Sequence, residues 1–189
     1  MSTEQGSITK LVNDLRVGTN PIEGTALDSL YESLAVMARD RVRQLGKPGE
    51  IRTGDLVNEV YIKLFGRETA IPWESRRHFY GAAARAMQQV IVDLARRLAV
   101  RREHAPRIAV PIEQGEREAP TLALPVLVEM LDELERVDPL AAEVVRMRVF
   151  AGLSVEEAAR VLAIPLRTAQ RKWTIGRGLA LAWLSARME

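Results

Sequence analysis

The residues whose types and spacing point most clearly to a function lie in the stretch LSVEEAARVLAIPLRTAQRKW, which runs from Leu153 to Trp173. Ser154 and Glu157 form the S-x-x-E pattern of a capping box, in which each side chain satisfies a free backbone N–H at the start of a helix. Pro165 suits the first turn of a helix but not its interior, so a second helix is expected to begin there. This order of elements is typical of a helix-turn-helix, which places its second helix in the major groove of DNA.

The second helix of this motif is expected to present basic and amide side chains to a partner. Ala169 and Trp173 are four residues apart and would face inward. Arg and Gln side chains read guanine and adenine edges through paired hydrogen bonds. The outward candidates for DNA contact are Arg167, Thr168, Gln170, Arg171 and Thr174. An ordinary helical hairpin with a solvated basic face is the alternative interpretation of this window.

The composition is that of an ordinary folded chain. It has 189 residues, of which 47% are hydrophobic and 28% charged, which fits one domain or two small ones. There is no cysteine, so disulfides and thiolate zinc sites are excluded, and two histidines argue against a histidine-based metal site. No apolar run approaches a membrane span, and the start of the chain lacks the apolar core of a secretory signal. We therefore expect a cytoplasmic protein without membrane insertion or a metal site.

Charge is unevenly distributed, although the net charge is only +2. Arginines dominate between residues 85 and 107, acidic residues dominate between 113 and 143, and the chain is basic again from Arg146 onward. Each phosphate that a protein neutralises releases counterions, which favours binding. Two basic surfaces separated by an acidic segment therefore suggest two contacts with a polyanion.

Helical periodicity dominates the whole chain, and no segment alternates convincingly like a strand. The expected helices cover about residues 7–16, 25–45, 54–65, 75–101, a stretch from 126, 139–150 and the two helices of the motif. Between His104 and Pro125 the pattern dissolves into a stretch rich in proline and glutamate, which predicts an extended linker. The predicted fold class is all-α, with two small helical domains, 1–102 and 126–189, joined by a flexible linker over 103–125.

Three segments make the chain resemble the extracytoplasmic-function (ECF) group of bacterial sigma factors, which are dissociable subunits that give RNA polymerase its promoter specificity. Asp55–Phe65, DLVNEVYIKLF, is similar to the region 2 helix of the family. His78–Arg102 resembles the helix that contacts the promoter −10 element, and the run from Asp138 to Leu184 resembles region 4. The segments cover most of residues 25–185 in the family's order. HFYGAAARAM and RKWTIGRGLA look closest to a subgroup found often in bacteria rich in Ser/Thr protein kinases.

The resemblance implies that the region 2 helix docks on the clamp coiled coil of the largest polymerase subunit. The outward residues that would make this contact are Asp55, Asn58, Glu59 and Lys63. For Asp55, the alternative is an acid that simply favours the N-terminus of its helix. Many relatives carry an acidic run before this position, whereas this chain has Arg52-Thr53-Gly54. Phosphorylation of Thr53 by a kinase would add negative charge there, and the alternative is an ordinary residue near the helix cap.

The resemblance also implies that the long helix and the loop before it, about Gly66 to Arg77, engage the −10 element. Family members hold an unstacked base there, and side-chain contacts must offset the energy of flipping it out. Trp73 and Tyr80 are the aromatic candidates, whereas Phe79 fits the buried stripe. The polar candidates are Arg85, Gln88, Gln89, Arg96 and Arg97, and a solvated helix face is the alternative for each.

In the same way, the second helix of the motif would read the −35 element. Lys172 and Arg177 would touch the DNA backbone there, because phosphate contacts outnumber base contacts. The family's turn often carries Gly where Ala163 stands and a Ser or Thr cap where Pro165 stands. These two departures allow a different entry angle for the helix.

Two other classes of function compete with the sigma factor interpretation. A conventional helix-turn-helix regulator would bind a duplex palindrome as a dimer without being a polymerase subunit. An enzyme is poorly supported, because the sequence has no glycine-rich phosphate loop, no paired metal-ligand histidines and no nucleophile with a suitable base. No cofactor is implied. An anti-sigma protein and a Ser/Thr kinase are further partners that the sequence leaves open.

Overall fold

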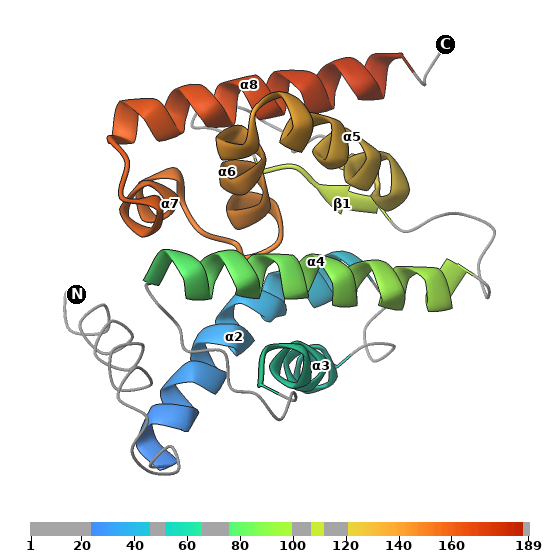
Figure 1. Ribbon diagram of the computed structural model, residues 1–189. Coiled ribbons are helices and arrows are strands. Elements are labelled where there is room, and N and C mark those ends of the chain that lie inside the picture. The colour runs from blue at the N-terminus through green and yellow to red at the C-terminus, as the bar shows by residue number, and fades with distance from the viewer. Residues whose placement is uncertain (1–23, 46–51, 66–75, 100–106, 112–120, 187–189) are drawn as a thin grey trace.

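The computed structural model describes residues 24–45, 52–65, 76–99, 107–111 and 121–186. Within these ranges the chain is built from helices and one short pair of strands, so the all-α fold class is confirmed. The helix expected over residues 7–16 lies outside the described residues. The elements in chain order are α2 (Gly24–Leu45), α3 (Thr53–Phe65), α4 (Arg76–Ala99), β1 (Arg107–Ala109), β2 (Thr121–Ala123), α5 (Leu124–Val137), α6 (Pro139–Val149), α7 (Val155–Leu162) and α8 (Leu166–Ser185) (Figure 1).

Helix α4 lies between two helical layers (Figure 1). Helices α2 and α3 contact one side of it, and α5, α6 and α7 contact the other. Small residues let both layers approach, since Ala83, Ala84 and Ala86 are all buried along α4. The buried side chains of both layers belong to one continuous hydrophobic cluster. The two halves that the sequence suggests as separate domains therefore pack against each other, and their boundaries stay a prediction.

The two short strands correct the expectation that no part of the chain is extended and paired. β1 and β2 run antiparallel, with Ile108 opposite Leu122, and both of these side chains are almost fully buried. β1 contacts α2, and β2 leads directly into α5. Three residues are too few for period-2 alternation to be visible in a sequence. The pairing therefore ties the described ends of the predicted linker, residues 107–111 and 121–123, to the helical body.

Helix α6 is the centre of the C-terminal half and contacts α5, α7 and α8. The Asp138 carboxylate caps it by accepting a hydrogen bond from the Ala141 N–H at 3.0 Å, and Pro139 takes the first helical position. Most of its side chains are buried, including Val144, Val145 and Met147. This buried helix is the support on which the helix-turn-helix rests.

The capping box at the start of α7 is present as the sequence predicts. The Glu157 N–H donates to the Ser154 Oγ at 3.1 Å, and the Ser154 N–H donates to the Glu157 carboxylate at 2.7 Å. The backbone N–H groups of Ser154 and Glu157 have no carbonyl acceptor within the helix, and these two hydrogen bonds satisfy them. The box sets the residue at which the first helix of the motif begins.

Ser154→Ala is expected to lower the free energy of unfolding by about 1 kcal/mol, because it leaves the Glu157 N–H without its side-chain acceptor. Urea unfolding followed by circular dichroism measures the change. Ser185→Ala is the matched control, since the Ser185 hydroxyl only donates to the Leu181 carbonyl of its own helix. Equal stabilities for the two variants would contradict the role of the box.

The turn of the motif forms without the glycine that the family often has. Ala163 adopts a left-handed conformation, with φ 53° and ψ 43°, at some cost in strain for a residue with a Cβ atom. The Ile164 N–H donates to the Ala159 carbonyl at 3.1 Å and closes α7. The Pro165 carbonyl then accepts from the Thr168 and Ala169 N–H groups, so the expected second helix begins here.

Candidate nucleic-acid and polymerase interfaces

Helix α8 is anchored by an aromatic side chain and exposes a polar stripe. Ala169 and Trp173 are almost fully buried, as their four-residue spacing predicts. The Arg148 guanidinium lies over the Trp173 ring, 4.8 Å from its centroid, which adds a cation–π contact to the apolar packing. The exposed polar residues of the first turns, called here the α8 stripe, are Arg167, Gln170, Arg171 and Thr174.

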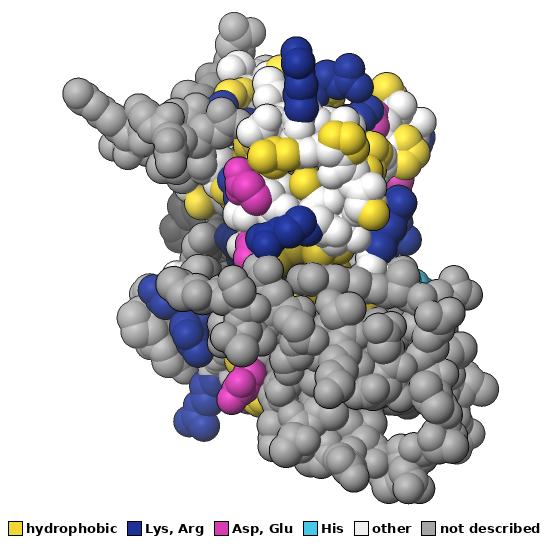
Figure 2. All heavy atoms as spheres, turned by 90° about the vertical axis from the view of Figure 1, so that its left-hand side faces the viewer, with side chains coloured by type: hydrophobic (Ala, Val, Ile, Leu, Met, Phe, Trp, Pro, Cys, Tyr) yellow, Lys and Arg dark blue, Asp and Glu magenta, His cyan; other side chains and the backbone are white. Residues whose placement is uncertain are grey.

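The α8 stripe has the chemistry of a surface that binds DNA. The whole helix contains no Asp or Glu, so no carboxylate on it opposes the two arginines. Figure 2 shows the end of the molecule on the left of Figure 1, where Lys and Arg side chains are spread over the upper part among white and yellow surface, with some Asp and Glu side chains between them. Thr168, another candidate, is half-buried. The sequence did not single out Leu166, which is 42% exposed beside the stripe and offers the kind of apolar contact that suits a thymine methyl group.

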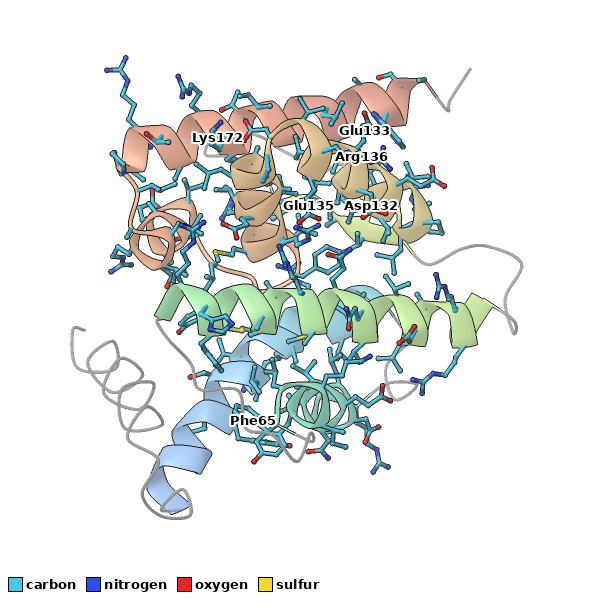
Figure 3. The ribbon with its side chains drawn as sticks, in the orientation of Figure 1. Phe65, Asp132, Glu133, Glu135, Arg136 and Lys172 are labelled. Atoms are coloured by element: carbon cyan, nitrogen blue, oxygen red, sulfur yellow. The ribbon has the colours of Figure 1, made fainter. Side chains whose placement is uncertain are left out.

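Two of the predicted DNA-backbone contacts lie apart from the α8 stripe. The Lys172 Nζ is 2.5 Å from the Asp138 Oδ2, and both side chains are mostly buried, at 17% and 19% exposure. Lys172 therefore joins α8 to the start of α6 (Figure 3). Arg177 is half-buried, one turn beyond the stripe.

The pKa of Asp138 reflects its position at this junction. Burial alone would raise the pKa, but hydrogen bonds from Lys172 and from the Ala141 N–H oppose it, together with the charges of Lys172 and Arg171. The net effect holds the pKa of Asp138 below its ordinary value. The carboxylate is therefore ionised at neutral pH, and it both caps α6 and pairs with α8.

The candidates on α4 fall into an exposed stripe and two flanks. Arg85, Gln89 and Arg96 are exposed along one face, as their spacing predicts. Arg97 lies on the flank toward α3, where its guanidinium contacts the Glu59 carboxylate at 3.1 and 3.2 Å. Gln88 lies on the other flank, where its Oε1 accepts a hydrogen bond from the Arg146 Nε at 2.9 Å.

The aromatic candidates for the −10 element differ in where they lie. Tyr80 is only 4% exposed and packs edge-on against Phe79, with ring centroids 5.4 Å apart. It therefore belongs to the core in this conformation, as Phe79 does. Trp73 and the loop around it lie outside the described residues.

Helix α3 exposes a mixed polar and apolar face. Leu56, Val57 and Val60 are fully buried, which turns Asp55 and Asn58 toward solvent. Ile62 is 63% exposed and lies about two turns after Asp55 and one turn after Asn58, so it shares their face. We call Asp55, Asn58 and Ile62 the α3 face. Ile62 is absent from the sequence prediction, although its spacing of seven residues from Asp55 would have placed it there.

The other two polymerase candidates on α3 contact α4. Glu59 pairs with Arg97, and the Lys63 Nζ lies 3.9 Å from the Asp93 carboxylate. Thr53, the candidate for phosphorylation, is the first residue of α3 and is half-buried. Glu59 and Lys63 therefore stabilise the α3–α4 pair as well as lying beside the α3 face.

The described residues hold neither a cluster suited to a metal ion nor a helix suited to a membrane. They contain no cluster of three or more His, Cys, Asp or Glu side chains placed to hold a metal ion. Among the helices that the structure describes, none is long and apolar enough to cross a membrane.

A family model described as ECF sigma factor matches residues 5–189. No curated protein and no solved structure matches the chain. The family match extends over both halves of the molecule and includes α3, α4 and the helix-turn-helix of α7 and α8. Sigma factors act as subunits of RNA polymerase, so core polymerase and promoter DNA are the partners that this match implies. This match covers nearly the whole chain and agrees with the three segments noted in the sequence. The chain therefore belongs to the ECF sigma factor family.

Proposed function

We propose that this protein binds core RNA polymerase through the α3 face, recognises the −10 element through α4 and the loop before it, and reads a −35 element through the α8 stripe. The observation that carries the proposal is the α8 stripe itself. Its two arginines, one glutamine and one threonine are exposed on a helix that contains no acidic residue and is anchored by Trp173. Such a helix can enter the major groove and form bidentate contacts with base edges.

The α3 face supports the polymerase contact. An exposed Ile62 flanked by Asp55 and Asn58 offers an apolar centre with a polar rim, which is the arrangement that protein interfaces favour. The partner segment would be the clamp coiled coil of the largest polymerase subunit. Thr53 stands at the N-terminus of the same helix, so a phosphate there would add negative charge next to Asp55.

The exposed stripe of α4 supports the −10 contact. Arg85, Gln89 and Arg96 are spaced along one face of a helix that is 24 residues long, so they could follow a strand of DNA over several phosphates. This contact and the one made by α8 would use the two basic parts of the sequence. A protein with two such contacts and a polymerase-binding face would act on transcription initiation rather than by occupancy of an operator.

Run-off transcription with core polymerase and a promoter library tests the proposal. We expect transcripts that depend on this protein and that share two sequence elements, with core polymerase alone as the control. Asp55→Lys should reduce both co-elution with core polymerase and transcript yield, because it reverses the charge at the rim of the α3 face. Absence of binding to core, together with tight binding to a duplex palindrome, would contradict the proposal and favour a conventional regulator.

A further inference from the structure

The C-terminal half contacts the same part of α4 that is proposed to bind DNA. The Arg77 guanidinium lies 2.9 Å from the Glu143 carboxylate, and the Arg85 guanidinium lies 3.1 Å from the Glu135 carboxylate. One turn further along, Gln88 accepts the hydrogen bond from Arg146. Glu135 lies near the end of α5, and Glu143 and Arg146 lie on α6; we call this whole set of interactions the α4–α6 contact. It extends over three turns on one side of α4 and includes Arg85 and Gln88, both candidates for the −10 element.

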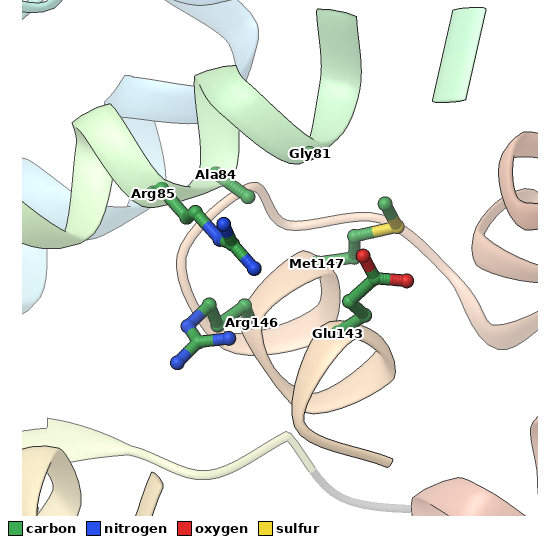
Figure 4. A pocket seen from close by; sticks show the side chains of 6 residues that line it. All are labelled: Gly81, Ala84, Arg85, Glu143, Arg146 and Met147. Atoms are coloured by element: carbon green, nitrogen blue, oxygen red, sulfur yellow. The ribbon is translucent and has the colours of Figure 1, made fainter. Parts of the chain in front are cut away.

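The α4–α6 contact combines charged and polar pairs with buried apolar packing, and it has a small gap near its middle. Gly81, Ala84 and Arg85 of α4 and Glu143, Arg146 and Met147 of α6 line a small pocket between the two helices (Figure 4). A Cβ atom built on Gly81 would meet nothing within 4 Å. Ala84 and Met147 are buried and add apolar contact beside the gap.

Arg146 and Glu135 give the contact its electrostatic centre. The Arg146 Nη2 lies 2.6 Å from Glu135, whose other carboxylate oxygen faces Arg85. The hydrogen bond from Arg146 is the largest influence on Glu135 and, with the charges of both arginines, lowers the pKa of its carboxyl group against the opposing effect of burial. The Arg146 Nη1 is buried and has no hydrogen-bond partner among the described residues. Water could reach this atom if the two halves separated, so separation would relieve an unsatisfied donor.

We propose that the α4–α6 contact is a closed state in which Glu135 and Glu143 occupy the positions that DNA phosphates take on α4, so that DNA and the C-terminal half compete for this helix. The inference rests on the proposed −10 contact. A carboxylate and a phosphate both pair with a guanidinium in the same geometry, so Arg77 and Arg85 can exchange one for the other. The exchanged pairs are half exposed, at 53% and 56% for the arginine side chains, and salt screens such pairs.

The competition predicts that removing the two carboxylates opens the protein and strengthens DNA binding. The chain has no cysteine, so Glu32→Cys and Ser185→Cys can carry a fluorescent pair that reports the separation of α2 and α8 in the full-length protein. We expect Glu135→Gln with Glu143→Gln to lower the transfer efficiency in the absence of DNA. If about one tenth of the wild-type protein is open, affinity for a labelled single-stranded oligonucleotide should rise about tenfold in this variant.

A matched control removes the same charge from the same half of the molecule. Asp132 and Glu133 are exposed on α5, where Glu133 pairs with Arg136 of its own helix (Figure 3). Asp132→Asn with Glu133→Gln should leave the transfer efficiency unchanged and show only the gain in DNA affinity that net charge produces. Circular dichroism checks that each variant is folded. Arg77→Glu should also open the protein, and adding Glu143→Arg should close it again by restoring the pair with reversed charges.

The outcomes separate this inference from the proposed function. Transfer efficiencies and DNA affinities that are the same in the Glu135/Glu143 variant and in the control would overturn the closed state. Opening without a gain in DNA affinity beyond that of the control would overturn the competition. If the variants open and bind the oligonucleotide as expected but core polymerase yields no transcript, the proposed function fails while the competition stands.

Discussion

Gly176→Ala should lower the free energy of unfolding by about 2 kcal/mol, whereas Gly178→Ala, two residues along the same helix, should raise it by about 0.5 kcal/mol. The reason is where each added Cβ atom would lie. At Gly176 it would overlap the Val145 Cγ2 of α6 and lie 3.3 Å from the Leu134 Cδ2 of α5. Val145 is branched and only 2% exposed, so it has little room to move.

At Gly178 the added atom would meet nothing within 4 Å, so only the backbone effect remains. Alanine restricts the unfolded chain more than glycine does and therefore favours the helix. Urea unfolding of the two variants and the wild type measures both changes. A stabilising effect of Gly176→Ala would contradict the close approach of α8 to α5 and α6 that supports the α8 stripe.

Arg171→Ala should reduce run-off transcription from a promoter with a matching −35 element by about tenfold or more. A bidentate Arg contact with a base contributes about 1–3 kcal/mol of discrimination, and tenfold corresponds to about 1.4 kcal/mol. Arg171 is exposed in the middle of the α8 stripe, so its loss should not affect folding.

Arg136→Ala is the matched control for Arg171→Ala, because Arg136 is an exposed arginine of the same half whose partner is Glu133 on its own helix. It should leave transcription nearly unchanged. The loss caused by Arg171→Ala should also shrink on a promoter whose −35 element has been replaced. Equal losses on both promoters would mean that Arg171 contributes charge without reading bases.

Local signals in the sequence were enough to predict the helix-turn-helix. The capping box at Ser154 and Glu157, the proline at 165 and the spacing of Ala169 and Trp173 each depend on residues no more than four apart. Such interactions belong to single helices and their ends, so the pattern of residue types encodes them directly. The exposed face of α4 was predictable for the same reason.

The contacts between elements could not be predicted in this way. Lys172 meets Asp138 across 34 residues, and Arg146 meets Gln88 across 58. Side-chain periodicity tells which face of a helix is polar, but it does not tell which other helix will cover that face. Candidates assigned to DNA from their type alone, such as Lys172 and Gln88, therefore prove to contact other parts of the protein as well.

The turn at Ala163 and the β1–β2 pair are two further features that local sequence patterns could not predict. A left-handed residue is usually signalled by glycine, and here an alanine adopts that conformation because α7 and α8 both pack on α6. The strands are three residues long and are positioned by the contact of β1 with α2. Tertiary packing therefore determined the turn against the local preference of alanine, and it determined the strands without any local signal.

Run-off transcription by core RNA polymerase, with and without this protein, tests the central claim most directly. The account predicts that transcripts from selected promoters appear only when the protein is present. It also predicts that thymines in the −10 element become reactive to permanganate at the same time, because the strands have separated there. Core polymerase that gives the same products and the same permanganate pattern with or without the protein would contradict the account.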